Sequence, residues 1–429
     1  MDRRRRVPVG DRPALRPRHG RDHRKEPSLN GLLFKVACAI VGALVGGAAI
    51  LGFSSITSRE DQTRAEELVP ETASTPVEVV KRKPVRATNA RLFLAWAAGG
   101  VEASTERALE RVPGVAEATT VEAGLDWIRT TRGANGEVLD RPPKGLRIPF
   151  EHAYVDPLEY AQFVPSADRA LVRALGPGES LLAQSSAELR GGDEGLRIDV
   201  GRARLAVAGA ITDVGAAGYE AITAGRAPGA WTRIERYVLV RLKRGAPRAR
   251  IMRTVEPVEP GARLRVRSQH ETPFLRYGDA VLPQLIVKQT FGEFAARELP
   301  EGFIEIDKAW RERNIRTESL PLLGEVTCHR LVFPQLRATL ADIRNEGLSH
   351  TVTHYGGCYS PRFINRIPGS RLSHHAWGIA FDLNVAENAY STSPDIDRRL
   401  VNRFEEHGFT WGGDWLVPDG MHFEWVKFD

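Results

Sequence analysis

The chain has 429 residues, of which 42% are hydrophobic and 27% charged, which is enough for one or two packed domains. Its net charge of +6 comes from residues 1–30, since the remaining chain has 50 basic and 50 acidic residues. We therefore expect no nucleic-acid partner, because a nucleic-acid surface needs a basic face on the folded part.

An apolar segment follows this basic tail. Residues 31–53 read GLLFKVACAIVGALVGGAAILGF and carry one charge, Lys35, near the start. About 20 apolar residues span a bilayer, and the basic tail favours a cytoplasmic N-terminus. We predict a single-pass cell-membrane protein with a basic cytoplasmic tail (1–30), a transmembrane helix (31–53) and an extracytoplasmic remainder. A cleaved signal peptide is the alternative, but the apolar run is long and no small-residue cleavage site follows it.

Two of the three cysteines, Cys328 and Cys358, lie in the predicted extracytoplasmic part, where disulfides persist. A bridge between them would close a loop of about 30 residues and contribute about 3–4 kcal/mol of stability. We predict this disulfide, with two buried thiols as the alternative.

The middle of the chain shows no ligand cluster, phosphate-binding loop or dinucleotide motif. Residues 54–90 are polar and predict a flexible stalk, and residues 91–290 predict a β-rich extracytoplasmic domain of unknown role, either a spacer or a site for a protein partner. Segment 177–213 is faintly similar to the extracellular domains of some ABC-type permeases, and we assign it no function. The predicted elements are helices over 91–111, 167–175 and 180–190, a hairpin over 196–212, and strands over 235–242 and 262–268.

Residues 291–317 predict a connector of mixed helical character, and residues 318–429 a further domain. The segment FPQLRATLADIRNEGL, residues 333–348, predicts an amphipathic helix, because Leu336, Leu340 and Ile343 share one face and Gly347 is a natural end.

The segment SHHAWGIAFD, residues 373–382, carries two good metal ligands in an apolar run. Alternation in the strand that follows Gly378 points Phe381 into the core and Asp382 away from it. His375 precedes this strand, so it converges with Asp382 only if the chain bends at the glycine.

A catalytic zinc usually has three protein ligands and an open fourth position. The third ligand is expected in the short alternating strand MHFEW, as His422. Asp419, three residues earlier, is in place to act as a general base without binding the metal.

These residues resemble the zinc D-Ala-D-Ala peptidase family, which includes carboxypeptidases, dipeptidases and L-alanyl-D-glutamate endolysins. The pattern S-x-H-x-x-G-x-A-x-D followed by acid-x-x-H is supplied by Ser373, His375, Gly378, Ala380 and Asp382, then Asp419 and His422. The resemblance covers about residues 318–429. It implies Zn²⁺ on His375, Asp382 and His422, Asp419 as the base, and a small α+β domain with a central antiparallel sheet.

The chain departs from the dipeptidase members, which have Glu where it has Asp419, and agrees there with the endolysin type. The resemblance also implies an arginine near the developing oxyanion. Arg362 is the best match, with Arg366 and Arg371 as rivals. Ser373 is expected to orient a ligand or cap a turn, and Glu424 to contact a ligand histidine. We leave His374 out of the site, because it is adjacent to a ligand but on the other side of the backbone.

The overall prediction is an α+β protein in which a transmembrane helix and a β-rich domain precede a zinc peptidase domain. We expect it to hydrolyse peptidoglycan stem peptides outside the cell, as a D-alanyl-D-alanine carboxypeptidase or an L-alanyl-D-glutamate endopeptidase. The alternative is a wall-binding or scaffold protein with a structural zinc site, although such a site needs no base. A peptidase on other peptides is a third interpretation.

Overall fold

The computed structural model describes residues 91–229, 231, 233–258, 264–268, 273–279 and 282–427. The predicted tail, transmembrane helix and stalk, residues 1–90, lie outside the described residues and stay predictions. No helix within the described ranges has the length and apolar character needed to cross a bilayer.

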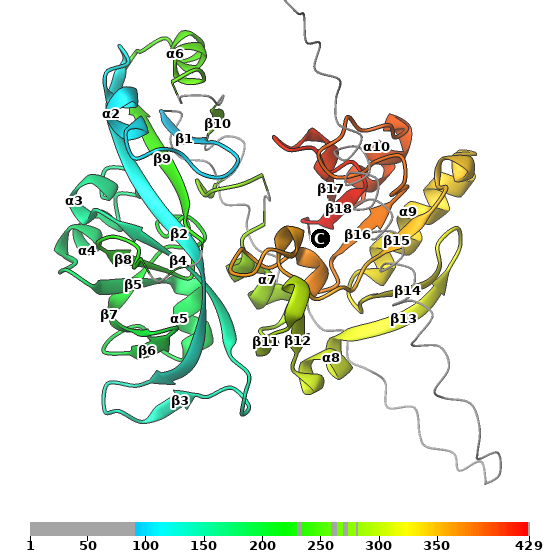
Figure 1. The fold of residues 1–429 in the computed structure, drawn as a ribbon, viewed down its shortest axis with the longest axis horizontal. Coiled ribbons are helices and arrows are strands. Elements are labelled where there is room, and N and C mark those ends of the chain that lie inside the picture. Colours follow the sequence, from blue (N-terminus) through cyan, green and yellow to red (C-terminus); the bar gives the residue numbers. More distant parts are fainter. Residues whose placement is uncertain are drawn as a thin grey trace, which may run out of the picture. The chain divides into compact units, whose positions relative to one another are not determined.

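The described residues up to Ser268 form a ten-stranded sheet with the order β10-β1-β9-β2-β4-β8-β5-β7-β6, and β3 pairs with β2 (Figure 1). The pairs β4–β8 and β5–β7 are parallel and the others antiparallel. The strands are β1 (Leu92–Trp96), β2 (Val115–Arg132), β3 (Val138–Asp140), β4 (Ile148–Val155), β5 (Glu179–Ala183), β6 (Arg197–Val200), β7 (Ala203–Ile211), β8 (Ala221–Ala224), β9 (Glu235–Leu242) and β10 (Arg265–Ser268).

The hairpin predicted over residues 196–212 is confirmed as β6 and β7, which pair Val200 with Ala203 around the Gly201–Arg202 turn. The strand over 235–242 and the helix within 167–175 are also present, as β9 and α4. The helices of this region are α2 (Thr105–Glu110), α3 (Pro157–Tyr160), α4 (Arg169–Ala174), α5 (Gln184–Arg190) and α6 (Arg248–Val255).

Two predicted helices are wrong in their first halves. Residues 91–111 begin as strand β1, which is buried along its whole length between β9 and β10, and become helical only in α2. Residues 180–190 likewise begin within β5 and continue as α5. The reason is the same in both cases. A strand buried on both faces reads as a continuous apolar run, which periodicity does not distinguish from a buried helix.

The C-terminal part begins with α7 (Gln284–Phe291). The connector over 291–317 was predicted as mixed helix, but its first part is mainly extended. There, β11 (Ala296–Glu298) and β12 (Ile304–Ile306) form an antiparallel hairpin around the turn at Pro300–Gly302. The remaining elements are α8 (Lys308–Asn314), β13 (Ile315–Leu320), β14 (Gly324–His329), α9 (Phe333–Asn345), β15 (Tyr355–Gly357), β16 (Ala380–Leu383), α10 (Arg398–Glu406), β17 (Phe409–Trp411) and β18 (His422–Trp425).

The expected antiparallel sheet of the C-terminal part has the order β15-β16-β18-β17 (Figure 1). Phe404 of α10 packs against Phe381 of β16 and Phe423 of β18, at ring-centroid distances of 5.1 and 4.8 Å. The sheet therefore buries its aromatic face under α10 and leaves the opposite face for polar side chains.

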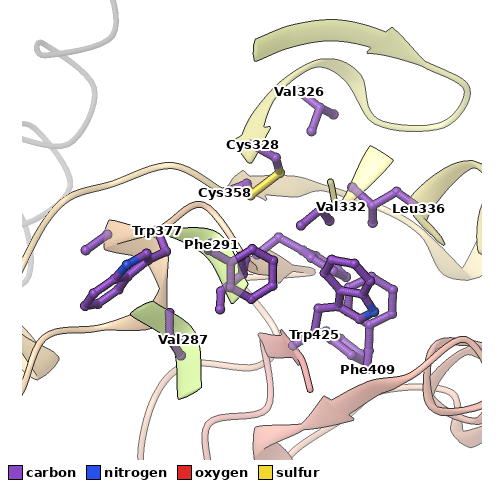
Figure 2. Packing of buried hydrophobic residues seen from close by; sticks show 14 of the residues in the cluster. Val287, Phe291, Val326, Cys328, Val332, Leu336, Cys358, Trp377, Phe409 and Trp425 are labelled. Carbon is purple, nitrogen blue, oxygen red and sulfur yellow. A yellow bond between two sulfur atoms is a disulfide. The ribbon is translucent and has the colours of Figure 1, made fainter. Parts of the chain in front are cut away.

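A hydrophobic core joins this sheet to the elements around it. Figure 2 shows Phe291 of α7, Trp377, Trp425 and the disulfide within one cluster. The predicted helix over residues 333–348 is confirmed as α9, which adds Leu336, Leu340 and Ile343 as buried residues. Since Val287 and Phe291 belong to the same cluster, α7 is part of this core.

Candidate metal centre

Strands β16 and β18 place two of the predicted ligands opposite each other. Their antiparallel register pairs Asp382 directly with His422. Phe381 and Leu383 are fully buried on the other face, as the alternation predicted. Directly opposite residues of an antiparallel pair have neighbouring Cβ atoms, so the carboxylate and the imidazole meet on the polar face.

The predicted bend brings in His375. It lies in a 3₁₀ turn, His374–Ala376. The N-cap residue of this turn, Ser373, accepts a hydrogen bond from the His375 backbone N–H at 3.4 Å. Gly378 follows with φ +68°, and a Cβ there would lie 2.7 Å from the backbone nitrogen of His329. Only glycine fits this turn without strain.

The three ligand atoms lie close together. His375 Nε2 is 3.2 Å from Asp382 Oδ1 and 3.1 Å from His422 Nδ1, and the last two atoms are 3.1 Å apart. Zinc bonds of about 2.0–2.2 Å in a tetrahedral arrangement separate neighbouring ligands by about 3.3 Å. The predicted set of His375, Asp382 and His422 is therefore assembled in a geometry that fits a zinc ion.

Each histidine has a partner at its other ring nitrogen. His375 Nδ1 donates to the carbonyl of Cys358 at 2.7 Å, and His422 Nε2 donates to Glu424 Oε1 at 3.1 Å. In the neutral form of each ring, these partners leave a lone pair on His375 Nε2 and on His422 Nδ1, as metal ligation requires. Glu424 thus has the contact expected of it.

The predicted disulfide is present between Cys328 and Cys358, with a Cα–Cα distance of 5.5 Å. It ties β14 to the segment whose carbonyl holds His375. The bridge therefore supports a ligand as well as the fold.

The charges of the cluster favour a cation. Burial by itself lowers the pKa of His422, but hydrogen bonds to Asp382 and Glu424 raise it to about 10. Burial likewise raises the pKa of Asp382, but the neighbouring His375 and His422 outweigh it and hold that pKa well below its ordinary value. A site that stabilises positive charge so strongly on an imidazole also suits a divalent ion.

Asp419 lies beside the ligands but outside the ligand set. Its backbone carbonyl accepts a hydrogen bond from His422 N–H at 3.1 Å. Within the described part of the chain, its buried Oδ1 has no hydrogen-bond partner. Burial raises the pKa of this carboxyl, and the nearby His422 and Arg362 only partly offset the effect. Such a group is available to take a proton.

The three candidate arginines differ in their contacts. Arg362 Nη2 is 3.8 Å from Asp382 Oδ2, and burial lowers the pKa of this guanidinium. Arg366 lies over the ring of Phe303, and Arg371 bonds to Glu235 of β9. Of the three, Arg362 is the one with an ion-pair contact to a ligand carboxylate.

His374, which was left out of the predicted site, is not among the three clustered ligand residues. It lies in the 3₁₀ turn, and its Nδ1 is 3.1 Å from Glu424 Oε1, so Glu424 is shared between His374 and His422. Sequence reasoning did not predict this contact.

Comparisons with known proteins agree with this site. Residues 368–425 match the family model described as D-alanyl-D-alanine carboxypeptidase, a zinc peptidase family. No curated protein matches the chain. The crystal structure of the periplasmic region of MacB from Actinobacillus actinomycetemcomitans is 6% identical with a TM-score of 0.30, and the match covers 44% of this chain and 94% of that one. Likeness at that level does not define a shared fold.

The matched segment runs from just before the bend to the end of β18, and it contains all three ligand residues and Asp419. Over residues 368–425, the C-terminal part of this chain is thus similar to the zinc D-alanyl-D-alanine carboxypeptidase family.

Proposed function

We propose that the protein is a membrane-anchored zinc peptidase that hydrolyses peptidoglycan stem peptides. The observation that carries the proposal is the meeting of His375, Asp382 and His422, with their ligand atoms 3.1–3.2 Å apart, inside a segment that matches the peptidase family. Asp419 supports an enzymatic role, because a purely structural zinc site has no use for a half-buried carboxylate at its edge whose Oδ1 has no hydrogen-bond partner among the described residues.

Zinc, when bound, supplies a Lewis acid for the scissile carbonyl and lowers the pKa of water to about 7. The chain's own residues supply the rest. Asp419 accepts the proton of the attacking water and passes it to the leaving amine nitrogen. The Arg362 guanidinium, already beside Asp382, stabilises the negative charge that develops on the carbonyl oxygen.

Two bonds in the stem peptide are candidate substrates. The description of the matched family model supports release of the terminal D-alanine. The aspartate at position 419, which the chain shares with endolysin-type members, supports cleavage between L-alanine and D-glutamate. The two products differ in mass, so one measurement separates them.

The proposed location is the outer face of the cell membrane, with the N-terminus in the cytoplasm. The apolar run over residues 31–53 and the basic tail support it. The Cys328–Cys358 disulfide also supports it, because structural disulfides persist in oxidising compartments.

The test is to incubate the full chain in detergent with defined muropeptides, with and without a chelator, and to measure products by mass spectrometry. We expect zinc-dependent loss of one D-alanine or a cut at L-alanyl-D-glutamate. Asp419→Asn is the matched control, and it should bind zinc while losing on the order of 10²–10⁴-fold in kcat.

Intact muropeptides with zinc confirmed bound would reject the peptidase proposal and favour the wall-binding scaffold. Cleavage of unrelated peptides at the same rate as muropeptides would reject the substrate class.

A further inference from the structure

The two loops that carry Arg362 and Asp419 both contact the β-rich region. We propose that Asp279 and the Glu235–Arg371 pair are positioning residues, through which the β-rich region holds these loops at the spacing that hydrolysis requires. This inference rests on the proposed function and adds a role for a region to which the family match, residues 368–425, does not extend.

The first contact is an ion pair between Arg371 and Glu235. Arg371 Nε lies 2.9 Å from Glu235 Oε1, and each side chain is 11% exposed. Arg371 also lies over the Tyr277 ring and against Gly278, where a Cβ would collide with its guanidinium. Gly278 has φ +89°, so this close approach depends on glycine.

The second contact is a hydrogen bond to the other loop. The Leu416 backbone N–H donates to Asp279 Oδ2 at 2.6 Å. The Leu416 side chain packs against the hydrophobic cluster of the β-rich region. Asp279 is itself held by Arg267 of β10, whose Nη2 lies 2.8 Å from Oδ1. The loop is therefore bonded to a carboxylate that is fixed from the sheet side.

One short segment, Tyr277–Gly278–Asp279, connects both contacts to the sheet. The Tyr277 hydroxyl donates to the carbonyl of Ala97 at 3.1 Å and accepts from Gly99 N–H at 2.9 Å. Its ring packs against Trp96 of β1, at a centroid distance of 5.0 Å. Anchored in this way, the segment meets Arg371 on one side and Leu416 on the other.

The positions of these contacts in the loops link them to the chemistry. Arg371 lies between Arg362 and the ligand His375, and Leu416 lies three residues before Asp419. The neighbouring Trp415 ring is 5.4 Å from the His422 ring. By contrast, Asp382 and His422 are held by the strand pairing of β16 and β18. Loosening the loops should therefore disturb the base and the arginine more than the metal ligands.

Energetics point the same way. A buried ion pair adds little net stability over apolar residues of the same shape, but it fixes one geometry. A displacement of about 1 Å in a catalytic group costs on the order of 10²-fold in rate. The Glu235–Arg371 pair and Asp279 are thus better suited to fixing the loops than to stabilising the fold.

The test uses the full chain with Asp279→Ala and Glu235→Gln. We expect kcat on muropeptides to fall about 10–100-fold with KM and zinc affinity nearly unchanged. Asp279→Asn keeps an oxygen that accepts from Leu416 and should restore most of kcat. Glu117→Gln, which breaks the Glu117–Arg241 ion pair on the same sheet, is the matched control and should leave kcat unchanged.

Amide hydrogen exchange gives a readout that is independent of activity. In Asp279→Ala, residues 412–421 should exchange at least tenfold faster, while β16 and β18 stay protected. Unchanged kcat or unchanged exchange in these loops would overturn the inference, as would a loss of zinc affinity equal to the loss of kcat. If the wild-type chain cleaves no muropeptide, the proposed function fails, and the exchange experiment still decides whether the loops are held.

Discussion

Two buried histidines, one in each region of the molecule, show opposite behaviour. His152 of β4 lies among Phe150, Tyr154 and Trp231, and neither ring nitrogen has a hydrogen-bond partner among the described residues. Burial lowers its pKa to about 3. His422 of β18 is also buried, yet its pKa is raised to about 10, because Asp382 and Glu424 are hydrogen-bonded to it. The neighbouring carboxylates, and not burial, make the difference.

Buried carboxylates differ between the regions in the same way. In the β-rich region, Glu220 lies 2.8 Å from Lys288 and Glu151 lies 2.5 Å from Arg276, so each is matched by a cation of the chain. In the C-terminal sheet, Asp382 and Glu424 meet mainly imidazoles. The charge of a buried acid that is paired with Lys or Arg is already balanced within the chain. The acids that are paired mainly with imidazoles can instead be balanced by an external cation.

Removal of a ligand should have the largest effect. In His375→Ala or His422→Ala we expect zinc binding to be lost and hydrolysis to fall on the order of 10³-fold or more, since a metal ion contributes several kcal/mol to catalysis. Elemental analysis and muropeptide hydrolysis measure the two losses. His350→Ala, at an exposed histidine, is the control. Full zinc occupancy in either ligand variant would contradict the assignment.

The matched pairs of the β-rich region can be broken separately. Lys288→Met leaves the buried Glu220 without its cation and should lower the free energy of unfolding by about 3–5 kcal/mol. Lys308→Met, which breaks an exposed pair with Glu312, should cost under about 1 kcal/mol. Denaturant titration measures both. Equal losses in the two variants would show that Glu220 is not the buried, matched acid described above.

Glu424→Gln tests the unmatched acids at the metal centre. The variant keeps an oxygen near His422 but removes the charge, and loss of such a partner lowers metal affinity by about 10–100-fold. Competition with a zinc-binding dye measures the affinity. Glu318→Gln, at a partly exposed ion pair with Arg337, is the control. An unchanged affinity would mean that Glu424 does not tune the ligand.

The contrast between the histidines also predicts a pH effect. Unfolded His152 gains a proton below pH about 6.5 and the folded residue does not, so its contribution to stability is complete above that pH and is lost as the pH falls toward 3. In His152→Phe, the drop in unfolding free energy between pH 7.5 and 5.5 should be smaller by about 1.4 kcal/mol. Denaturant titrations at both values measure it. If the unfolding free energy dropped equally in wild type and variant, the pKa of folded His152 would not be lowered, and its ring would have a hydrogen-bond partner.

Some helices and strands could be predicted because the sequence patterns that specify them are local. The α9 helix has an apolar stripe and a glycine end, and the β6–β7 hairpin alternates on both sides of Gly201. The helices predicted over residues 91–111 and 180–190 failed at β1 and β5, where burial on both faces removes the alternation. The contact of His374 with Glu424 was not predicted, because it depends on the 3₁₀ turn over residues 374–376.

The sequence by itself determined the ligand types, their order and the glycine that bends the chain, because coordination chemistry and backbone sterics restrict those positions to few residues. Only the tertiary structure decided which arginine lies beside Asp382 and that Glu235 and Asp279 hold the two loops. The Glu235–Arg371 and Asp279–Leu416 contacts join residues that are separated by 136 and 137 positions in the chain. Residues of these types are common on any protein surface. No local pattern marks such a pair, because its geometry exists only when both regions are folded.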